Sequence, residues 1–89
     1  MLRKIIKFSA DFCWPCKLIS PIIKEICSEK WIMLEEVDVE EHGDYAESYG
    51  ISKVPTVVFM KENWDKHMII WAKQKEEYIK ELEMFLANV

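Results

Sequence analysis

The sequence contains few cysteines, prolines and glycines. Its 89 residues include three cysteines, three prolines and two glycines, and no internal repeat or low-complexity stretch interrupts them. Three cysteines are too few for a disulfide framework, and Cys13 and Cys16 lie close together in a reactive arrangement. This use of cysteine indicates a reducing compartment, and we expect the protein to be cytoplasmic.

Long hydrophobic runs are also missing. No stretch approaches the length of a membrane-spanning helix. The first eight residues carry Lys4 and Lys7 inside their apolar stretch and lack the apolar region of a secretory signal. We therefore expect no membrane association.

Basic residues are not in excess. The formal net charge is −4, and carboxylates are concentrated between positions 35 and 47, a distribution that repels phosphate. A nucleic-acid partner is therefore not expected. His42 and His67 have no ligand spacing to either cysteine of the close pair, so we expect no metal site.

The residues that are present suffice for a single packed domain over residues 1–89. Apolar residues make up 51% of the chain and charged residues 31%, which supplies one core and a solvated surface. Hydrophobic periodicity predicts strands at residues 3–8, 31–39, 51–60 and 67–72, and helices at 14–29, 44–49 and 75–88. A helix that connects the first two strands makes them parallel. The predicted fold is α/β, a four-stranded mixed sheet with helices on both faces in the order β-α-β-α-β-β-α.

Two helical stripes supply much of the expected core. Pro21 lies inside the first helix and should kink it rather than end it, because the apolar stripe continues beyond it. Cys27 lies on that stripe and is expected to be a buried small hydrophobe with no redox part. We assign Trp31, Trp64 and Trp71 to the core or to turns, and Met33, Met60, Met68 and Met84 to packing. The stripes are Leu18, Ile19, Ile22, Ile23, Ile26 and Cys27 in the first helix, and Tyr78, Leu82, Phe85 and Leu86 in the last.

The most informative motif is Cys13-Trp14-Pro15-Cys16, placed where a strand gives way to a helix. The N-terminus of a helix stabilises an anion, which favours the reactive thiolate of the first cysteine. The two-residue spacer also lets the second thiol close a disulfide. The same spacing makes half of a zinc site, and the surrounding βαβ pattern favours redox chemistry over metal binding.

Three landmarks make the chain resemble the thioredoxin superfamily along nearly its whole length. They are the segment from Phe8 to Lys17, Pro21 in the first helix, and Val54-Pro55-Thr56 before the third strand. The resemblance implies that Pro55 is cis and faces the cysteine pair. It also implies that Cys13 attacks a substrate disulfide and Cys16 resolves the mixed disulfide, with no bound cofactor. By the same resemblance, Trp14, Pro15, Val54 and Thr56 would contact the substrate.

Departures from the family pattern are equally specific. The chain resembles a trimmed core of glutaredoxin size that lacks the extra N-terminal strand and helix of full thioredoxins. Its two glycines, Gly43 and Gly50, do not supply the Gly-Gly pair expected for glutathione binding. Where thioredoxins place a buried aspartate and its lysine partner beneath the dithiol, the same offsets give Lys7 and Glu36. We therefore expect a reversed ion pair that tunes the charge around the cysteines.

The function that this resemblance implies is that of a small monomeric thiol-disulfide oxidoreductase. It would draw electrons from NADPH through a thioredoxin reductase-like flavoprotein and reduce disulfides in client proteins, with ribonucleotide reductase as one client. Two alternatives remain open at this point. One is a glutathione-dependent, glutaredoxin-like redoxin, and the other is a redoxin-fold interaction module that binds a metal or an iron-sulfur cluster.

Overall fold

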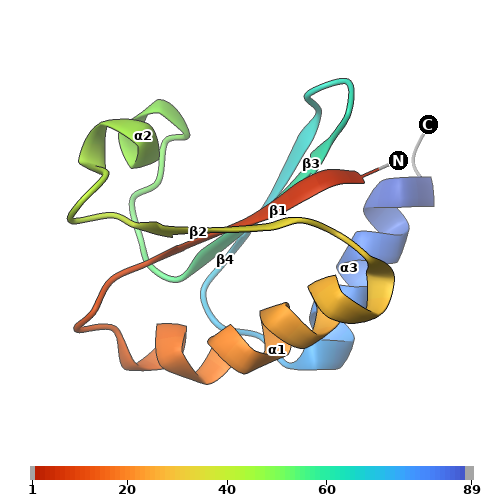
Figure 1. The fold of residues 1–89 in the computed structure, drawn as a ribbon, viewed down its shortest axis with the longest axis horizontal. Coiled ribbons are helices and arrows are strands. Elements are labelled where there is room, and N and C mark those ends of the chain that lie inside the picture. The colour runs from red at the N-terminus through yellow and green to blue at the C-terminus, as the bar shows by residue number, and fades with distance from the viewer. Residues whose placement is uncertain (1, 88–89) are drawn as a thin grey trace.

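The computed structural model describes residues 2–87 and contains the predicted elements in the predicted order (Figure 1). The predicted end of the last helix at Asn88 lies outside the described residues. The strands are β1 (Leu2–Ser9), β2 (Leu34–Asp38), β3 (Thr56–Lys61) and β4 (Lys66–Ile70). The helices are α1 (Trp14–Lys30), α2 (Gly43–Ser48) and α3 (Lys75–Ala87).

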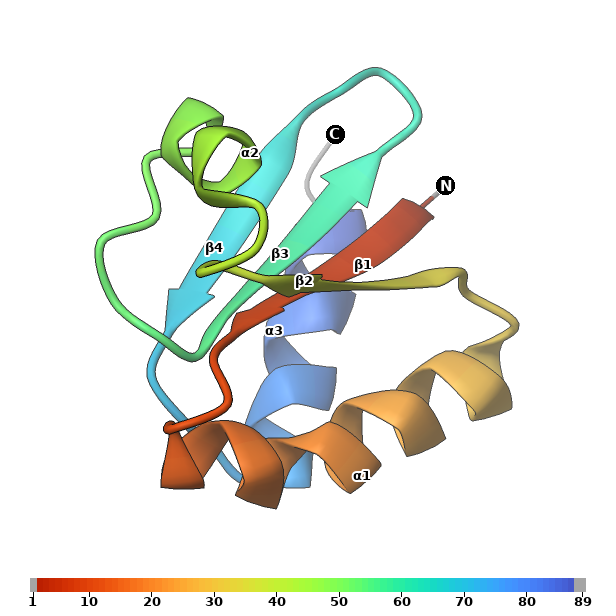
Figure 2. The same cartoon turned by 60° about the vertical axis from the view of Figure 1, so that its left-hand side comes forward.

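The strands form one mixed sheet in the order β2-β1-β3-β4 (Figure 2). β1 pairs with β2 in parallel, as the connecting helix requires, and with β3 in antiparallel orientation. β4 pairs with β3 in antiparallel orientation through the predicted hairpin. The predicted mixed four-stranded sheet is therefore confirmed.

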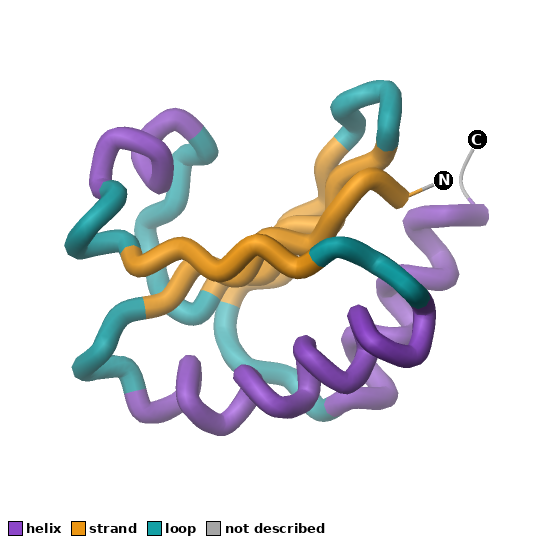
Figure 3. The backbone as a smooth tube through the Cα atoms, viewed as in Figure 1, coloured by secondary structure: helices purple, strands orange, loops and turns teal. Residues whose placement is uncertain are grey.

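Helices cover both faces of the sheet, α1 and α3 on one and α2 on the other (Figures 1 and 3). Alternate residues of the central strands serve the two layers, because successive side chains in a strand point to opposite faces. Ile5 and Phe59 pack with α1 and α3, whereas Ile6 and Phe8 pack toward α2. Lys7 shares the pleat face of Ile5 and so points toward α1.

The buried stripe of α1 largely confirms its predicted periodicity. Ile19, Ile23, Ile26 and Cys27 are buried, and the helix continues through Pro21 without ending. The assignment of Leu18 to this stripe was wrong, since its side chain is exposed. At about 100° per residue, Leu18 lies roughly a third of a turn from the centre of the buried stripe.

The remaining apolar assignments are partly confirmed. Tyr78 and Leu82 of α3 are buried and Phe85 is partly buried, as predicted. Three other assignments to packing or the core were wrong, because α3 contacts the protein along one narrow side and the segment before β2 lies at the surface. The exposed side chains are Leu86, Met33 and Met84.

Three of the four predicted strands were too long, whereas β1 extends one residue beyond its prediction at each end. β2 begins at Leu34 rather than at position 31, because Trp31 caps α1 in a left-handed conformation (φ 56°). β3 begins at Thr56 rather than at position 51, because residues 51–55 form a loop. β4 ends at Ile70 rather than at position 72, because Trp71 also adopts a positive φ of 78°. Trp31, Trp64 and Trp71 all lie in turns with exposed side chains, so the turn alternative was correct for them and the core alternative wrong.

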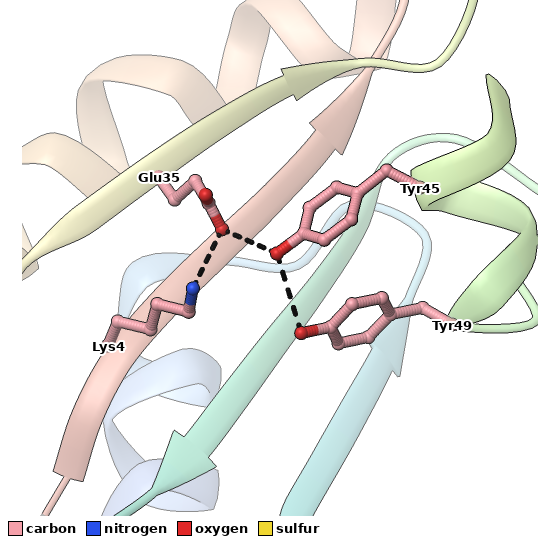
Figure 4. A network of polar contacts seen from close by, with 4 residues as sticks. All are labelled: Lys4, Glu35, Tyr45 and Tyr49. Carbon is pink, nitrogen blue, oxygen red and sulfur yellow. Dashed lines mark hydrogen bonds and ion pairs between the residues drawn. The ribbon is translucent and has the colours of Figure 1, made fainter. Parts of the chain in front are cut away.

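Hydrogen bonds and an ion pair connect α2 to its face of the sheet (Figure 4). The Tyr45 hydroxyl donates to Glu35 Oε1 at 2.9 Å, and the same carboxylate oxygen lies 3.1 Å from Lys4 Nζ. The Tyr49 hydroxyl lies 3.5 Å from that of Tyr45. Both tyrosine rings also pack against Phe8, which is fully buried at the end of β1. This face of the sheet is therefore held by structural contacts away from the α1 side.

The Trp31 cap yields a stability prediction. Its side chain is 95% exposed, and its backbone N–H caps α1 by donating to the Cys27 carbonyl. A left-handed conformation strains any residue with a Cβ, so Trp31→Gly should raise the free energy of unfolding by about 0.5–1 kcal/mol despite the extra entropy of unfolded glycine. Urea unfolding measures the change. Trp31→Ala removes the indole but keeps the Cβ, so it should leave stability nearly unchanged; an equal gain in both variants would contradict the cap argument.

Candidate active site

The two closely spaced cysteines lie at the N-terminus of α1, at the end of the sheet where β1 ends (Figure 2). Their sulfurs are joined in a disulfide, with the Cα atoms 5.3 Å apart. Both residues are buried, Cys13 being 6% and Cys16 2% exposed. Cys13 is therefore slightly more accessible to solvent than Cys16.

Cys13 is also the N-cap residue of α1. Its backbone is extended (φ −88°, ψ 104°), and its sulfur accepts a hydrogen bond from the Cys16 backbone N–H at 3.2 Å. A sulfur in this position faces the unpaired N–H groups and the positive end of the helix dipole. When the disulfide is reduced, this setting favours the thiolate of Cys13.

The loop before β3 faces the cysteine pair. The Val54–Pro55 peptide bond is cis, as the resemblance implied. Val54 is partly buried and packs against the small cluster formed by Cys13, Cys16 and Ala10. The Pro55 carbonyl accepts a hydrogen bond from the Trp71 N–H at 2.9 Å, which ties the loop to the end of β4.

Thr56 occupies a different place from the one expected of a substrate-contacting side chain. It is buried, and its hydroxyl donates to the Lys53 carbonyl at 2.7 Å. The side chain therefore stabilises the loop from inside rather than facing a substrate. Pro15, the other predicted contact beside Trp14, is partly exposed in the first turn of α1.

Exposed apolar side chains border the disulfide. Phe12, Trp14 and Leu18 are all more than half exposed, and they lie on the turn before Cys13 and on the first two turns of α1. Phe12 and Val54 also line a hollow of about 210 Å³. Trp71 is exposed beside the Pro55 loop. A single exposed apolar residue is ordinary, but several around one reactive bond suit contact with another protein.

Lys7 and Glu36 form the ion pair that their positions predicted. They are direct neighbours in the parallel register of β1 and β2, and Lys7 Nζ lies 2.9 Å from Glu36 Oε1. The hydrogen bond from Lys7 lowers the pKa of Glu36 below its ordinary value of 4.5, which outweighs the opposing effect of burial. The carboxylate is therefore ionised at neutral pH.

Ser20 is a site residue that the sequence interpretation missed. Lys7 Nζ donates to Ser20 Oγ at 2.9 Å, so the ammonium is bound from both β2 and α1. Ser20 lies one helical turn after Cys16, and residues four apart share a helix face. That spacing was the signal in the sequence that could have identified it. No comparable signal marked Trp71, because its position depends on the turn after β4.

Neither a metal cluster nor a membrane span accompanies the site in residues 2–87. No group of three or more histidine, cysteine or carboxylate side chains in this range is arranged to hold a metal ion. None of the described helices is both long and apolar enough to cross a bilayer.

Cys27 lies apart from this chemistry. Burial raises the pKa of its thiol to about 11, so only about one molecule in ten thousand carries the thiolate at pH 7. We therefore expect iodoacetamide to alkylate the native, reduced protein at Cys13, the more exposed thiol of the pair, but to leave Cys27 unmodified. Mass spectrometry of peptides before and after denaturation provides the measurement. Rapid labelling of Cys27 in the native state would show that the first helix exposes it.

A disulfide at a helix N-terminus, facing a cis-proline loop on a β-α-β-α-β-β-α fold, defines the class of dithiol-disulfide redox proteins. Comparison with known proteins identifies the family. The thioredoxin family model matches residues 2–84, so the chain belongs to the thioredoxin family.

Individual relatives agree with that family. The chain is 29% identical to a thioredoxin of Chlamydia caviae over 85% of its length and 76% of the relative's. It is 35% identical to thioredoxin H3 of Arabidopsis thaliana over 89% of its own length and 67% of the relative's. Among solved structures, thioredoxin 1 of Thermosipho africanus superposes with a TM-score of 0.85 at 28% identity, and each chain is covered to 94%. The family, its redox-active cysteine pair and a thiol-disulfide oxidoreductase activity are thus supported together.

Proposed function

We propose that the protein reduces disulfide bonds in other proteins through a cycle of Cys13 and Cys16. The observation that carries the proposal is the position of Cys13, which caps α1 through its sulfur and is the more exposed residue of the disulfide. The border of exposed apolar side chains supports a protein substrate over a small thiol. Trp14, Pro15 and Val54 are the proposed contacts, with Pro55 and Thr56 forming the loop opposite the dithiol.

The proposed cycle conserves atoms and electrons. The Cys13 thiolate attacks one sulfur of the client disulfide, which forms a mixed disulfide and releases the other client sulfur as a thiolate. The Cys16 thiolate then attacks the Cys13 sulfur, which forms the Cys13–Cys16 disulfide and frees the second client thiolate. The client gains two electrons, and its thiolates take protons from water. A further reductant must then restore the dithiol.

The electron source and setting complete the proposal. We assign re-reduction to a thioredoxin reductase-like flavoprotein that uses NADPH, in the cytoplasm, with the protein acting as a monomer. Ribonucleotide reductase is a proposed client. Turnover of ribonucleotide reductase with the reduced protein as its electron donor tests this client, separately from the general reduction of protein disulfides.

Reduction of insulin disulfides, coupled to NADPH oxidation, tests the proposed function. One reaction contains thioredoxin reductase, and a matched reaction contains glutathione with glutathione reductase. We expect NADPH oxidation in the first reaction only. Activity in the glutathione reaction alone would instead indicate a glutaredoxin-like protein. Inactivity in both, with a metal retained after purification, would indicate the interaction module.

A further inference from the structure

Lys7 is a buried charge that the redox cycle described above does not use. Its side chain is only 6% exposed, and it lies within β1 among apolar neighbours. An unpaired ammonium would be costly there, because burial removes its hydration. Glu36 and Ser20 each bind its Nζ at 2.9 Å, so the charge is retained and its position is fixed.

The Lys7 side chain shares a hollow with the second cysteine. Lys7, Cys16 and Ser20 together line a small hollow of about 150 Å³ beneath the first turns of α1. Ser20 connects the two, since it shares a helix face with Cys16 and accepts the hydrogen bond from Lys7. The charge therefore lies on the sheet side of α1 near the second cysteine, and it has the same sign as the N-terminal end of the helix dipole.

The two members of the ion pair are screened unequally. The Glu36 side chain is 45% exposed, so water solvates its carboxylate, whereas the Lys7 ammonium is almost fully enclosed. An enclosed charge acts over a lower effective dielectric constant than an exposed one. The field at Cys16 is therefore dominated by the positive charge. The lowered pKa of Glu36 also makes it a weak base, so its part is to hold Lys7 rather than to accept the thiol proton.

We propose that Lys7 is a positioning residue that stabilises the thiolate of Cys16, with Glu36 and Ser20 holding it in place. This rests on the proposed cycle and specifies its second step, in which the Cys16 thiolate attacks the Cys13 sulfur. The thiol proton of Cys16 goes to water, and the sulfur-sulfur bond to the client breaks as the Cys13–Cys16 bond forms. The same stabilisation favours the reduced protein and makes the dithiol a weaker reductant.

Other charged groups lie farther into solvent. Asp11 and Lys17 are at the rim of the same hollow, and both are exposed. Lys24 acts on Glu36, where it adds to the lowering of that carboxyl's pKa. Lys53 lies in the exposed part of the loop before β3. Water screens each of them more strongly than it screens Lys7, so the variants of the buried pair should have the larger effects.

The test uses two variants whose effects have opposite signs. Lys7→Met removes the positive charge, and it should lower about tenfold the equilibrium constant for reduction of the Cys13–Cys16 disulfide by glutathione, equivalent to about 30 mV. Glu36→Gln removes the counter-charge and should raise that constant. In a background with Cys13→Ser and Cys27→Ser, thiolate absorbance should show Cys16 titrating at higher pH with Lys7→Met and at lower pH with Glu36→Gln. Lys7→Arg keeps the charge and should restore most of the wild-type behaviour.

The opposite face of the sheet provides the matched control. Lys4 and Glu35 form an ion pair between the same two strands, but they lie with Tyr45 and Tyr49 on the α2 side (Figure 4). Lys4→Met and Glu35→Gln should leave both measurements unchanged. If Lys7→Met does not fold, the sign of the Glu36→Gln shift decides. The role of Lys7 would be overturned by shifts of the same sign in Lys7→Met and Glu36→Gln, or by no shift while the disulfide still exchanges with glutathione. A wild-type disulfide that exchanges with no reductant would instead overturn the proposed function itself.

Discussion

Replacing Cys13 with serine should reduce the rate of insulin reduction to that of a reaction without the protein. A hydroxyl at the N-cap position is not ionised near neutral pH, and the remaining thiol of Cys16 is only 2% exposed, so it cannot replace Cys13 in the attack on a client disulfide. Cys16→Ser should also stop turnover, but at a later step. Cys13 can still attack, and the mixed disulfide then persists because no second thiol resolves it.

Non-reducing electrophoresis distinguishes these two outcomes. With Cys16→Ser, we expect a covalent complex with a disulfide-containing client that disappears on addition of dithiothreitol, whereas Cys13→Ser should form none. Cys27→Ser is the matched control, because Cys27 is buried in α1 away from the disulfide. It should retain full activity. A complex that persists in Cys13→Ser but not in Cys16→Ser would reverse the assigned roles.

The fold could be predicted from the sequence because local and tertiary preferences agree. The apolar residues of β1 are buried on both faces of the sheet, and the three- and four-residue spacing of Ile19, Ile23 and Ile26 buries one continuous helix face. The helix between the first two strands fixes their parallel pairing, and the short polar turn before β4 fixes an antiparallel pair. These constraints fix two of the three strand pairs, whereas the antiparallel pairing of β1 with β3 is established by the structure.

The element ends could not be predicted in the same way. Trp31 and Trp71 have strong strand preferences, yet each adopts a positive φ that ends or precedes an element. The Trp71 N–H donates to the Pro55 carbonyl across the fold, whereas the Trp31 N–H donates to the Cys27 carbonyl within the last turn of α1. Hydrophobicity alone assigned both residues to the core as readily as to turns.

The candidate site was predictable where sequence position determines geometry. Cys13 and Cys16 follow a strand directly, and Lys7 and Glu36 occupy paired positions on adjacent strands. Ser20 completes the Lys7 site from a different element, so its role became apparent only when α1 was placed over β1. The exposure of Phe12 and Trp71 likewise depends on how loops meet at one end of the sheet.

Leu82→Ala should lower the free energy of unfolding strongly, and by much more than substitutions at the exposed positions Trp31 and Met84. Leu82 is fully buried on α3, in the cluster that joins this helix to α1 and the sheet. Truncation removes favourable burial and leaves a cavity, a combination that costs about 2–5 kcal/mol at such positions. For a domain of this size, that is a large part of the total free energy of unfolding. Urea unfolding monitored by circular dichroism measures the loss.

Met84→Ala is the matched comparison on the same helix. The sequence assigned both residues to packing, but the Met84 side chain is 63% exposed, so its truncation should change the free energy of unfolding by no more than about 0.5 kcal/mol. Both substitutions introduce the same good helix former, so differences in helix propensity cannot explain a large gap between them. Equal losses in the two variants would mean that α3 packs through a different face. A large loss in Leu82→Ala alone would show that this helix is stabilised by its narrow contact with α1 and the sheet.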